Sequence, residues 1–286
     1  MKFIDHALAR EILPKRKSDS SKGSFGRAAL IVGSEKYPGA AMLSLEAALR
    51  GGAGYVNYIG RKSLCERFSL RSPEALYTEL DYRVDSEREA IITTTSRASA
   101  ILIGCGCEPS ESLYLTVSEL LFTDGAPTIL DADAINAIAE FGSSNIIKNA
   151  KRRVILTPHP LEFSRLTGLA VAEIQAKRQS VAEDFAAKYN CILVLKGAGT
   201  VITDGDTTYI NTSGSSALAK AGSGDVLAGI LVSLLAFADN PLETAALAAY
   251  IHGRAGDNLA KELSEFGVTP SDLPLECARV IAELEK

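Results

Sequence analysis

The sequence predicts an α/β protein of three layers, α/β/α, in which helices cover both faces of a mostly parallel central sheet. Short apolar runs such as 27–33, 99–104 and 191–196 show no alternation of polar and apolar residues, as in strands buried on both faces. These runs alternate with segments of helical pattern, which is the order that produces a parallel sheet. With 286 residues, 47% of them hydrophobic, the chain is long enough to bury a substantial core.

The expected elements of the first half follow from where each apolar run begins and ends. Residues 1–21 are polar and are expected to form an N-terminal extension with a short helix and a loop. Strands are then expected at 27–33, 54–60, 99–104 and 127–132, and helices at 38–51 and 110–122. Glycines bound several of these runs, as they often do at the ends of strands and helices.

The second half is expected to begin with strands and to end in helices. Strands are predicted at 153–157 and 191–196, and Asp204-Gly205 predicts a hairpin turn between two further runs. A helical run follows the glycines near residue 222, and residues 240–243 and 269–272 carry the cap residues that open helices. No repeat or linker interrupts the chain, so residues 1–286 are expected to form a single domain.

Composition excludes several classes of protein. Asp and Glu outnumber Lys and Arg by 35 to 30, Trp is absent and aromatic residues make up 6%, so no nucleic-acid partner is expected. The five cysteines are scattered, which indicates reduced thiols and a cytoplasmic protein rather than a disulfide framework. The N-terminus lacks a signal-peptide pattern. The most apolar stretch, 226–238, is shorter than the roughly 20 residues of a membrane helix, so no membrane partner is expected.

The strongest local motif is Ala221-Gly222-Ser223-Gly224-Asp225, directly before an apolar helical run. Glycines at the start of a helix let backbone amides approach an anion, and the helix dipole favours negative charge there. An aspartate at the same place could take a proton from a hydroxyl that attacks phosphorus. The alternative is that Asp225 is an ordinary helix N-cap, and the segment alone does not decide between the two.

Two glycine-rich segments follow predicted strands without matching a known nucleotide motif. Residues 196–200, Lys-Gly-Ala-Gly-Thr, suit the ligand crevice of an open sheet, although a plain tight turn explains them equally well. They lack the Gly-Lys-Ser/Thr ending of a Walker A loop. Gly104-Cys105-Gly106 lacks the third glycine of the dinucleotide motif, which argues against a hydride-transferring enzyme. The spacing of Cys105 and Cys107 matches no common zinc site, so both are interpreted as small hydrophobic residues beside glycines.

Polar side chains follow two other predicted strands. His159 lies between two prolines that hold its backbone, although a loop histidine can equally be structural. Asp131 and Asp133 could bind Mg²⁺; alternatively, Asp133 caps the next helix and Asp131 bonds loop backbone. His6 and His252 lie in helical contexts, where packing is the favoured interpretation.

Taken together, six segments resemble the ADP/ATP-dependent NAD(P)H-hydrate dehydratases. The segments span residues 22–27, 37–41, 131–134, 157–160, 196–197 and 222–229. The resemblance runs from about residue 22 to the end and implies a ribokinase-like fold, in agreement with the predicted sheet. It also implies that the (S)-hydrate of NADH or NADPH is converted back to NAD(P)H. ADP (or ATP) would be the co-substrate, Mg²⁺ would accompany it, and AMP and phosphate would be released from ADP.

By this resemblance each matching position acquires an expected role. Asp225 would activate the substrate hydroxyl, beside an anion hole formed by Gly222, Ser223 and Gly224. The nucleotide would be held by Gly224 together with Lys196, Gly197, Ala198, Gly199 and Thr200. The hydrate would be bound by Asp225 together with Ala40, Ala41, Gly106 and His159. No ligand of Mg²⁺ is assigned.

The resemblance also implies partners and leaves alternatives open. A homo-oligomer, a tetramer, is expected, and an epimerase acting on the same hydrate would be a separate protein. At 214–217 this chain has Gly-Ser-Ser-Ala where the family commonly has Asn-Pro-Gly, and it has Cys105 where the family often has proline. The alternatives are a hydroxyl kinase of the same superfamily, acting on a thiazole or pyrimidine alcohol, and a non-catalytic nucleotide-binding module. The sequence does not choose between ADP and ATP, or between the two hydrates.

Overall fold

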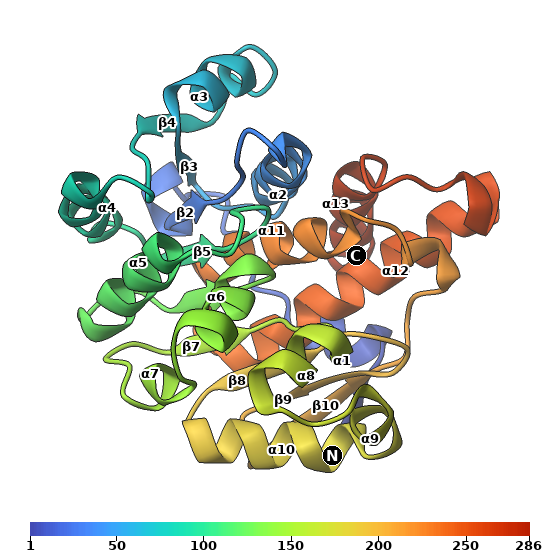
Figure 1. The fold of residues 1–286 in the computed structure, drawn as a ribbon. Coiled ribbons are helices and arrows are strands. Elements are labelled where there is room, and N and C mark those ends of the chain that lie inside the picture. Colours follow the sequence, from blue (N-terminus) through green and yellow to red (C-terminus); the bar gives the residue numbers. More distant parts are fainter.

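In the computed structural model, which describes residues 1–286, ten strands form one continuous sheet (Figure 1). The order across the sheet is β1-β10-β9-β8-β7-β6-β5-β2-β3-β4. The strands are β1 (Lys2–Ile4), β2 (Arg27–Ile31), β3 (Tyr55–Gly60), β4 (Leu76–Glu79), β5 (Ala100–Ile103), β6 (Thr128–Leu130), β7 (Val154–Leu156), β8 (Ile192–Leu195), β9 (Thr200–Thr203) and β10 (Thr208–Asn211). The predicted mixed α/β class is confirmed.

The sheet is mostly parallel, as predicted. Only β9 runs antiparallel to its neighbours, β8 and β10, and all other adjacent strands are parallel. The β9–β10 hairpin is also confirmed, with Asp204 Oδ1 accepting the N–H groups of Asp206 and Thr207 in its loop. Because the remaining strands run in one direction, β2 and β5 to β8 end at the same edge of the sheet.

Helices cover both faces of the sheet, which completes the three predicted layers. They are α1 (His6–Ile12), α2 (Pro38–Arg50), α3 (Lys62–Ser69), α4 (Arg88–Thr95), α5 (Glu111–Phe122), α6 (Asp133–Phe141), α7 (Asn145–Lys148), α8 (Pro160–Thr167), α9 (Val171–Ala176), α10 (Arg178–Tyr189), α11 (Ser223–Leu235), α12 (Pro241–Gly267) and α13 (Leu273–Leu284). Although α12 is 27 residues long, no helix combines the length and apolar character needed to cross a bilayer.

Two hydrophobic cores lie on opposite faces of the sheet. Helices from the two ends of the chain, blue and orange to red in Figure 1, cover one face, and the green and yellow helices from its middle cover the other. Along β2, Ala28 and Leu30 belong to the first core, whereas Ala29 and Ile31 belong to the second. Both faces of the strand are therefore buried, which explains why its sequence is apolar without alternation.

Two parts of the chain have structure that was not predicted from the sequence. Residues 2–4 form a strand, β1, that pairs with β10, in a region where only a helix and a loop were expected. The region between β3 and β5 contains α3, β4 and α4, for which no prediction was made. A three-residue strand and a four-residue edge strand are too short for their periodicity to be recognised, because pairing with a distant strand decides their conformation.

Candidate active site

A cluster of polar side chains lies at the carboxyl edge of the parallel strands. Cys105, Asp131 and Lys196 each follow the last residue of a strand by one or two positions, after β5, β6 and β8 respectively. Asp225 approaches from the first turn of α11, which packs against β5 and β2. Residues up to 120 positions apart in the sequence therefore meet because parallel strands end at one edge, where open α/β sheets bind ligands.

Asp131 lies at the centre of this cluster and is almost fully buried. Its Oδ1 accepts hydrogen bonds from Lys196 Nζ at 2.8 Å and from Thr157 Oγ1 at 2.6 Å, and its Oδ2 accepts one from the Cys105 thiol at 3.3 Å. The interpretation that Asp131 bonds loop backbone through its side chain is therefore wrong. Burial alone would disfavour the charge on Lys196, but Asp131 and Glu162 outweigh it and raise the pKa of the ammonium above its usual value.

Asp133 does not cap α6 in the expected way. The N-cap position belongs to Ala132, and Asp133 is the first residue of the helix. Its Oδ2 accepts the backbone N–H of Glu108 at 2.9 Å, and its Oδ1 accepts a hydrogen bond from the Asn136 amide at 3.4 Å. Asp133 therefore ties the start of α6 to the loop that follows β5, and burial raises its pKa.

Asp225 is not the N-cap of α11, so that alternative is wrong. Gly222 holds the cap position with a φ of 105°, and Asp225 is the third helical residue, with no capping bond from its side chain. Burial and the nearby charge of Asp131 raise its pKa to about 7, against the opposing influence of Lys196 and Cys105. A carboxylate with a pKa near neutrality can both accept and release a proton under physiological conditions.

The N-terminus of α11 offers backbone donors beside Asp225. The amides of Gly222, Gly224 and Asp225 make no hydrogen bond within the protein, whereas the Ser223 amide donates to the carbonyl of Lys220. A Cβ atom at position 224 would lie 3.3 Å from Lys196 Nζ, so the ammonium faces the start of this helix. Three free amides and one ammonium therefore lie at the start of this helix, where an anion is favoured.

Residues 196–200 form the tight turn between β8 and β9. Gly197 and Gly199 have φ values of 140° and 67°, which side chains rarely adopt, and Thr200 Oγ1 donates to the Gly197 carbonyl at 2.9 Å. Ala198 is exposed at the tip of the turn. The Lys196 amide donates to the Pro158 carbonyl, which joins this turn to the segment that carries His159.

His159 is the N-cap residue of α8, and it is paired with a residue that the sequence analysis missed. His159 Nδ1 accepts the amides of Leu161 and Glu162, and Glu162 Oε2 accepts the His159 amide at 2.8 Å. Glu162 is 4% exposed and lies 4.0 Å from Lys196 Nζ. Burial raises its pKa to about 7. The capping-box spacing of three residues is the sequence signal that could have identified Glu162.

The small residues predicted for the hydrate side bring α2 against the loops after β2 and β5. A Cβ atom at Gly106 would lie 2.7 Å from the Ala40 Cβ, and one at Gly33 would lie 2.5 Å from the Ala41 Cβ. Ala41 is fully buried, so its side chain packs inside the protein, whereas Ala40 is half-buried. These close approaches place the N-terminal end of α2 beside Cys105.

Of the other two histidines, His252 lies against the backbone of Ser223 at the start of α11, and His6 lies on α1. His252 is buried in α12, and burial lowers its pKa to about 4, so that it is neutral at physiological pH. His6 is the exposed first residue of α1. Neither residue contributes to the set of charges around Asp225, which agrees with the packing interpretation for His252.

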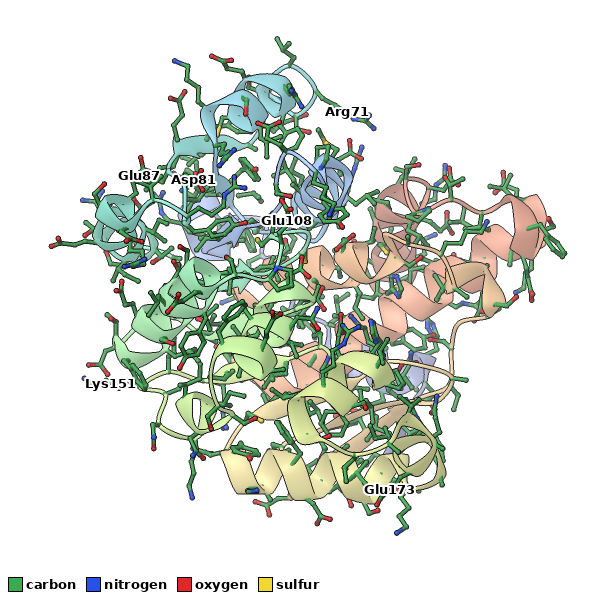
Figure 2. The ribbon with its side chains drawn as sticks, viewed as in Figure 1. Arg71, Asp81, Glu87, Glu108, Lys151 and Glu173 are labelled. Carbon is green, nitrogen blue, oxygen red and sulfur yellow. The ribbon has the colours of Figure 1, made fainter.

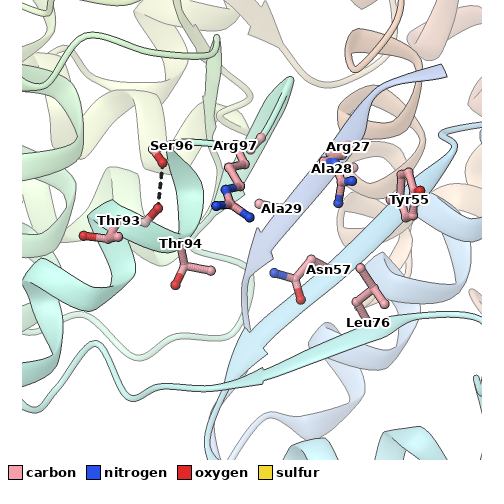
Figure 3. Close-up of a pocket in the computed structure, with 11 residues that line it drawn as sticks. Arg27, Ala28, Ala29, Tyr55, Asn57, Leu76, Thr93, Thr94, Ser96 and Arg97 are labelled. Carbon is pink, nitrogen blue, oxygen red and sulfur yellow. Dashed lines mark hydrogen bonds between the residues drawn. The ribbon is translucent and has the colours of Figure 1, made fainter. Parts of the chain in front are cut away.

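A second group of charges lies apart from this site, where Asp81 forms ion pairs with Arg61 and Arg83. Arg71, Lys151 and Glu173 lie at the periphery of the molecule (Figure 2). A hollow of about 440 Å³ lies at the amino ends of β2 and β3, lined in part by Arg27, Asn57 and other residues drawn in Figure 3. Its lining contains no carboxylate, thiol or imidazole, so it offers no group for acid–base chemistry near neutral pH.

The acidic residues of the cluster do not form a cage for a metal ion. The ligand atoms of Cys105, Asp131 and Asp225 lie within 4.8 Å of one another. However, the Lys196 ammonium already supplies the positive charge at 2.8 Å from Asp131. Magnesium usually keeps several waters and is held largely by substrate phosphates. We therefore assign no protein ligand to Mg²⁺.

Comparisons with known proteins agree with this geometry. A family model described as NAD(P)H-hydrate dehydratase matches residues 28–278. The ADP-dependent (S)-NAD(P)H-hydrate dehydratase of Bacillus subtilis is 36% identical over 257 residues, which cover 89% of this chain and 88% of that protein. The bifunctional NAD(P)H-hydrate repair enzyme of Thermofilum pendens is 35% identical over 90% of this chain. This chain spans about half the length of that bifunctional relative.

Solved structures give the same result. The crystal structure of the Bacillus subtilis ADP/ATP-dependent NAD(P)H-hydrate dehydratase, co-crystallised with ATP/Mg²⁺, has a TM-score of 0.88 at 33% identity and covers 99% of each chain. A ribokinase-like superfamily protein of Enterococcus faecalis has a TM-score of 0.86 at 27% identity, covering 100% of this chain and 97% of that one. A hydroxyethylthiazole kinase of Pyrococcus horikoshii, at 17% identity, shares the fold alone.

Proposed function

The chain belongs to the NAD(P)H-hydrate dehydratase family, and from this premise we propose that it restores NADH or NADPH from the (S)-hydrate, with ADP as phosphoryl donor. The observation that carries the proposal is the position of Asp225, a carboxylate of raised pKa beside free amides at the start of α11. A base and an anion site in contact are what phosphoryl transfer to a hydroxyl requires. The bifunctional relatives carry a second repair activity in their names, which we do not extend to this chain.

In the first step, Asp225 takes the proton of the substrate hydroxyl as its oxygen attacks the β-phosphorus of ADP. The bond from that phosphorus to the bridging oxygen breaks, and AMP leaves. In the second step, the electron pair of the ring nitrogen expels phosphate from the carbon that carried the hydroxyl. Loss of a proton from the adjacent carbon restores the dihydronicotinamide ring. Phosphate is a far better leaving group than hydroxide, which is why the nucleotide is needed.

The residues around Asp225 stabilise the charge that moves in the first step. The amides of Gly222 and Gly224, which are free of hydrogen bonds within the protein, and the Lys196 ammonium would face the transferred phosphoryl group. Donors that are already oriented lower the barrier without a cost of reorganisation at the moment of reaction. Residues 197–200 would hold the rest of the nucleotide, and Gly106, Ala40 and His159 would line the side of the hydrate.

Magnesium enters this scheme as part of the nucleotide complex. The relative from Bacillus subtilis was co-crystallised with ATP/Mg²⁺. In this chain, Asp131 is bound to Lys196 and Thr157, so the phosphates and water would supply the ligands of the ion. We also propose that residues 1–286 act as one domain, since one continuous sheet includes both β1 and β10. A tetramer is expected from the resemblance, and light scattering of the purified protein tests it.

Incubation of the protein with Mg²⁺, ADP and hydrated NADH tests the proposal. We expect the absorbance of reduced nicotinamide to return, with one AMP and one phosphate released per turnover. The hydroxyl kinase alternative predicts no gain in absorbance, and phosphorylation of a thiazole or pyrimidine alcohol instead. A nucleotide-binding module without catalysis predicts binding of ADP with no release of AMP.

A further inference from the structure

Cys105 occupies the space between the two central carboxylates. It follows β5, is fully buried, and donates its thiol hydrogen to Asp131 Oδ2 at 3.3 Å. The sulfur and the carboxylate oxygens of Asp131 and Asp225 all lie within 4.8 Å of one another. A single thiol is therefore in reach of the proposed base and of the buried partner of Lys196.

We propose that Cys105 is a positioning residue for Asp225: its one thiol proton is shared between the Asp131 and Asp225 carboxylates and holds the base ionised and oriented toward the substrate hydroxyl. This inference rests on the proposed function, since it assigns a partner to the base of that reaction. Cys105 does not touch the substrate in this scheme, and it acts only through Asp225.

The charges around Asp225 explain why a neutral donor matters at this position. Burial and repulsion by Asp131 and Asp133 raise the pKa of Asp225, whereas Lys196 and the thiol of Cys105 lower it. Burial and the Asp131 and Asp225 carboxylates raise the pKa of the Cys105 thiol well above its ordinary value. The thiol therefore keeps its proton near neutral pH and remains a hydrogen-bond donor rather than a third negative charge.

Three further titratable groups lie near Lys196. Glu162, at the start of α8, lies 4.0 Å from Lys196 Nζ and 3.3 Å from His159 Nε2. His252 on α12 is neutral, because burial lowers its pKa to about 4. Among the groups of α6, α8, α11 and the strand ends, Cys105 is thus the neutral donor that reaches both carboxylates.

The backbone fixes the position of the thiol. The Cys105 carbonyl accepts the Gly33 amide at 2.7 Å, which ties the loop after β5 to the end of β2. Gly104 and Gly106 on either side have φ values of 124° and 64°, and a Cβ atom at Gly104 would lie 2.0 Å from the Asp131 carbonyl oxygen. The loop is packed too closely to move away from Asp131, so the sulfur stays between the carboxylates.

Cys107 provides a matched control. It is also fully buried, two residues further along the same loop, but its thiol faces the Ile31 carbonyl at 3.4 Å. Removal of either sulfur by C105A or C107A leaves a cavity of similar size. Only C105A removes a donor to the carboxylates, and C105S restores one.

Activity against pH separates positioning from simple packing. We expect C105A to move the acid limb of the kcat profile upward by about one pH unit, with roughly tenfold lower kcat below that limb. C105S should return the limb to the wild-type position, and C107A should leave it there. The KM for ADP should change little in all three variants. An active C105A enzyme with the wild-type profile overturns the inference while the proposed function stands.

Infrared spectroscopy tests the same contact without any turnover. The S–H stretching band that disappears in C105A, and not in C107A, belongs to Cys105. We expect this band to shift between about pH 6 and about pH 8 as Asp225 titrates, and to stop shifting in the D225N variant. A band that is independent of pH in the wild type overturns the inference, even if the protein shows no activity on hydrated NADH. Failure of the proposed function and failure of this inference thus give different results.

Discussion

Removal of the Lys196 ammonium tests whether the buried ion pair holds the cluster together. Lys196 Nζ lies 2.8 Å from Asp131 and 4.0 Å from Glu162, and the side chain of Asp131 is 2% exposed. Replacement of Lys196 by methionine keeps most of the length of the side chain but leaves the Asp131 carboxylate without its counter-ion. Loss of one partner of a buried pair costs about 3–5 kcal/mol.

We expect a value at the lower end of this range. The side chain of Lys196 is itself 18% exposed, so water can replace part of the lost interaction. Thr157 and Cys105 also continue to donate to the Asp131 carboxylate. K196M should therefore lower the free energy of unfolding by about 3 kcal/mol, measured by urea denaturation at pH 7.

A double variant shows whether charge is the cause. K196M/D131N removes both charges and retains an oxygen that can accept from Thr157, so it should recover most of the loss. The control K17M changes an exposed lysine and should stay within about 0.5 kcal/mol of the wild type. A loss of less than about 1 kcal/mol in K196M, or no recovery in the double variant, would refute the ion-pair reasoning.

Three further predictions follow from the same site. D225N should bind ADP at least as tightly as the wild type but lose turnover by about 10²–10⁴-fold, because it removes a negative charge and the proton acceptor; wild-type kcat would exclude Asp225 as the base. T200W should abolish ADP binding in calorimetry while leaving the melting temperature unchanged. Unimpaired affinity for ADP would show that the nucleotide does not bind beside Thr200. In the folded protein the pKa of Glu162 is raised from its ordinary value of 4.5 to about 7, so the protonated carboxyl stabilises the fold. This contribution to the free energy of unfolding is lost as the pH rises from 4.5 toward 7. In the E162Q variant the free energy of unfolding should therefore fall less over that pH range, as measured by urea denaturation at several pH values. An unchanged slope of this free energy against pH would contradict the raised pKa of Glu162.

The sequence contained enough information for the sheet and for the edge that carries the site. Apolar runs without alternation identified β2 and β5 to β8, because burial on both faces removes the polar positions of a strand. Once these strands are parallel, the residues that follow them must meet at one edge, which is why Asp131 and Lys196 could be predicted as candidates before their contact was known. The glycines before α11 identified Asp225 for a similar reason, since a helix start is readable locally.

The contacts within the site could not be read from the sequence in the same way. Lys196 and Asp131 are 65 positions apart, and nothing in either segment indicates that the lysine pairs with the aspartate rather than with the nucleotide. Cys105 looked like a small hydrophobic residue, and only the register of β5 beside β6 brings its thiol to Asp131. Glu162 looked like an ordinary helix residue because its burial depends on the packing of α8 against α6. Tertiary packing decides all three roles.

The raised pKa of Asp225 implies that nucleotide binding and catalysis respond to pH in opposite directions. The Mg²⁺ complex of ADP is still negative, so its arrival beside Asp225 raises the pKa of that carboxyl further above about 7. By linkage, ADP must bind more tightly when Asp225 is protonated, whereas the chemical step requires the ionised form. Calorimetry between about pH 6 and about pH 8 should therefore show weaker ADP binding as the pH rises, while single-turnover rates increase. The D225N variant removes the contribution of Asp225 and retains the titration of ADP itself, so its affinity should depend less on pH. An identical pH dependence in both proteins would mean that the carboxyl group and the nucleotide do not sense each other, and Asp225 could not then lie beside the transferred phosphoryl group.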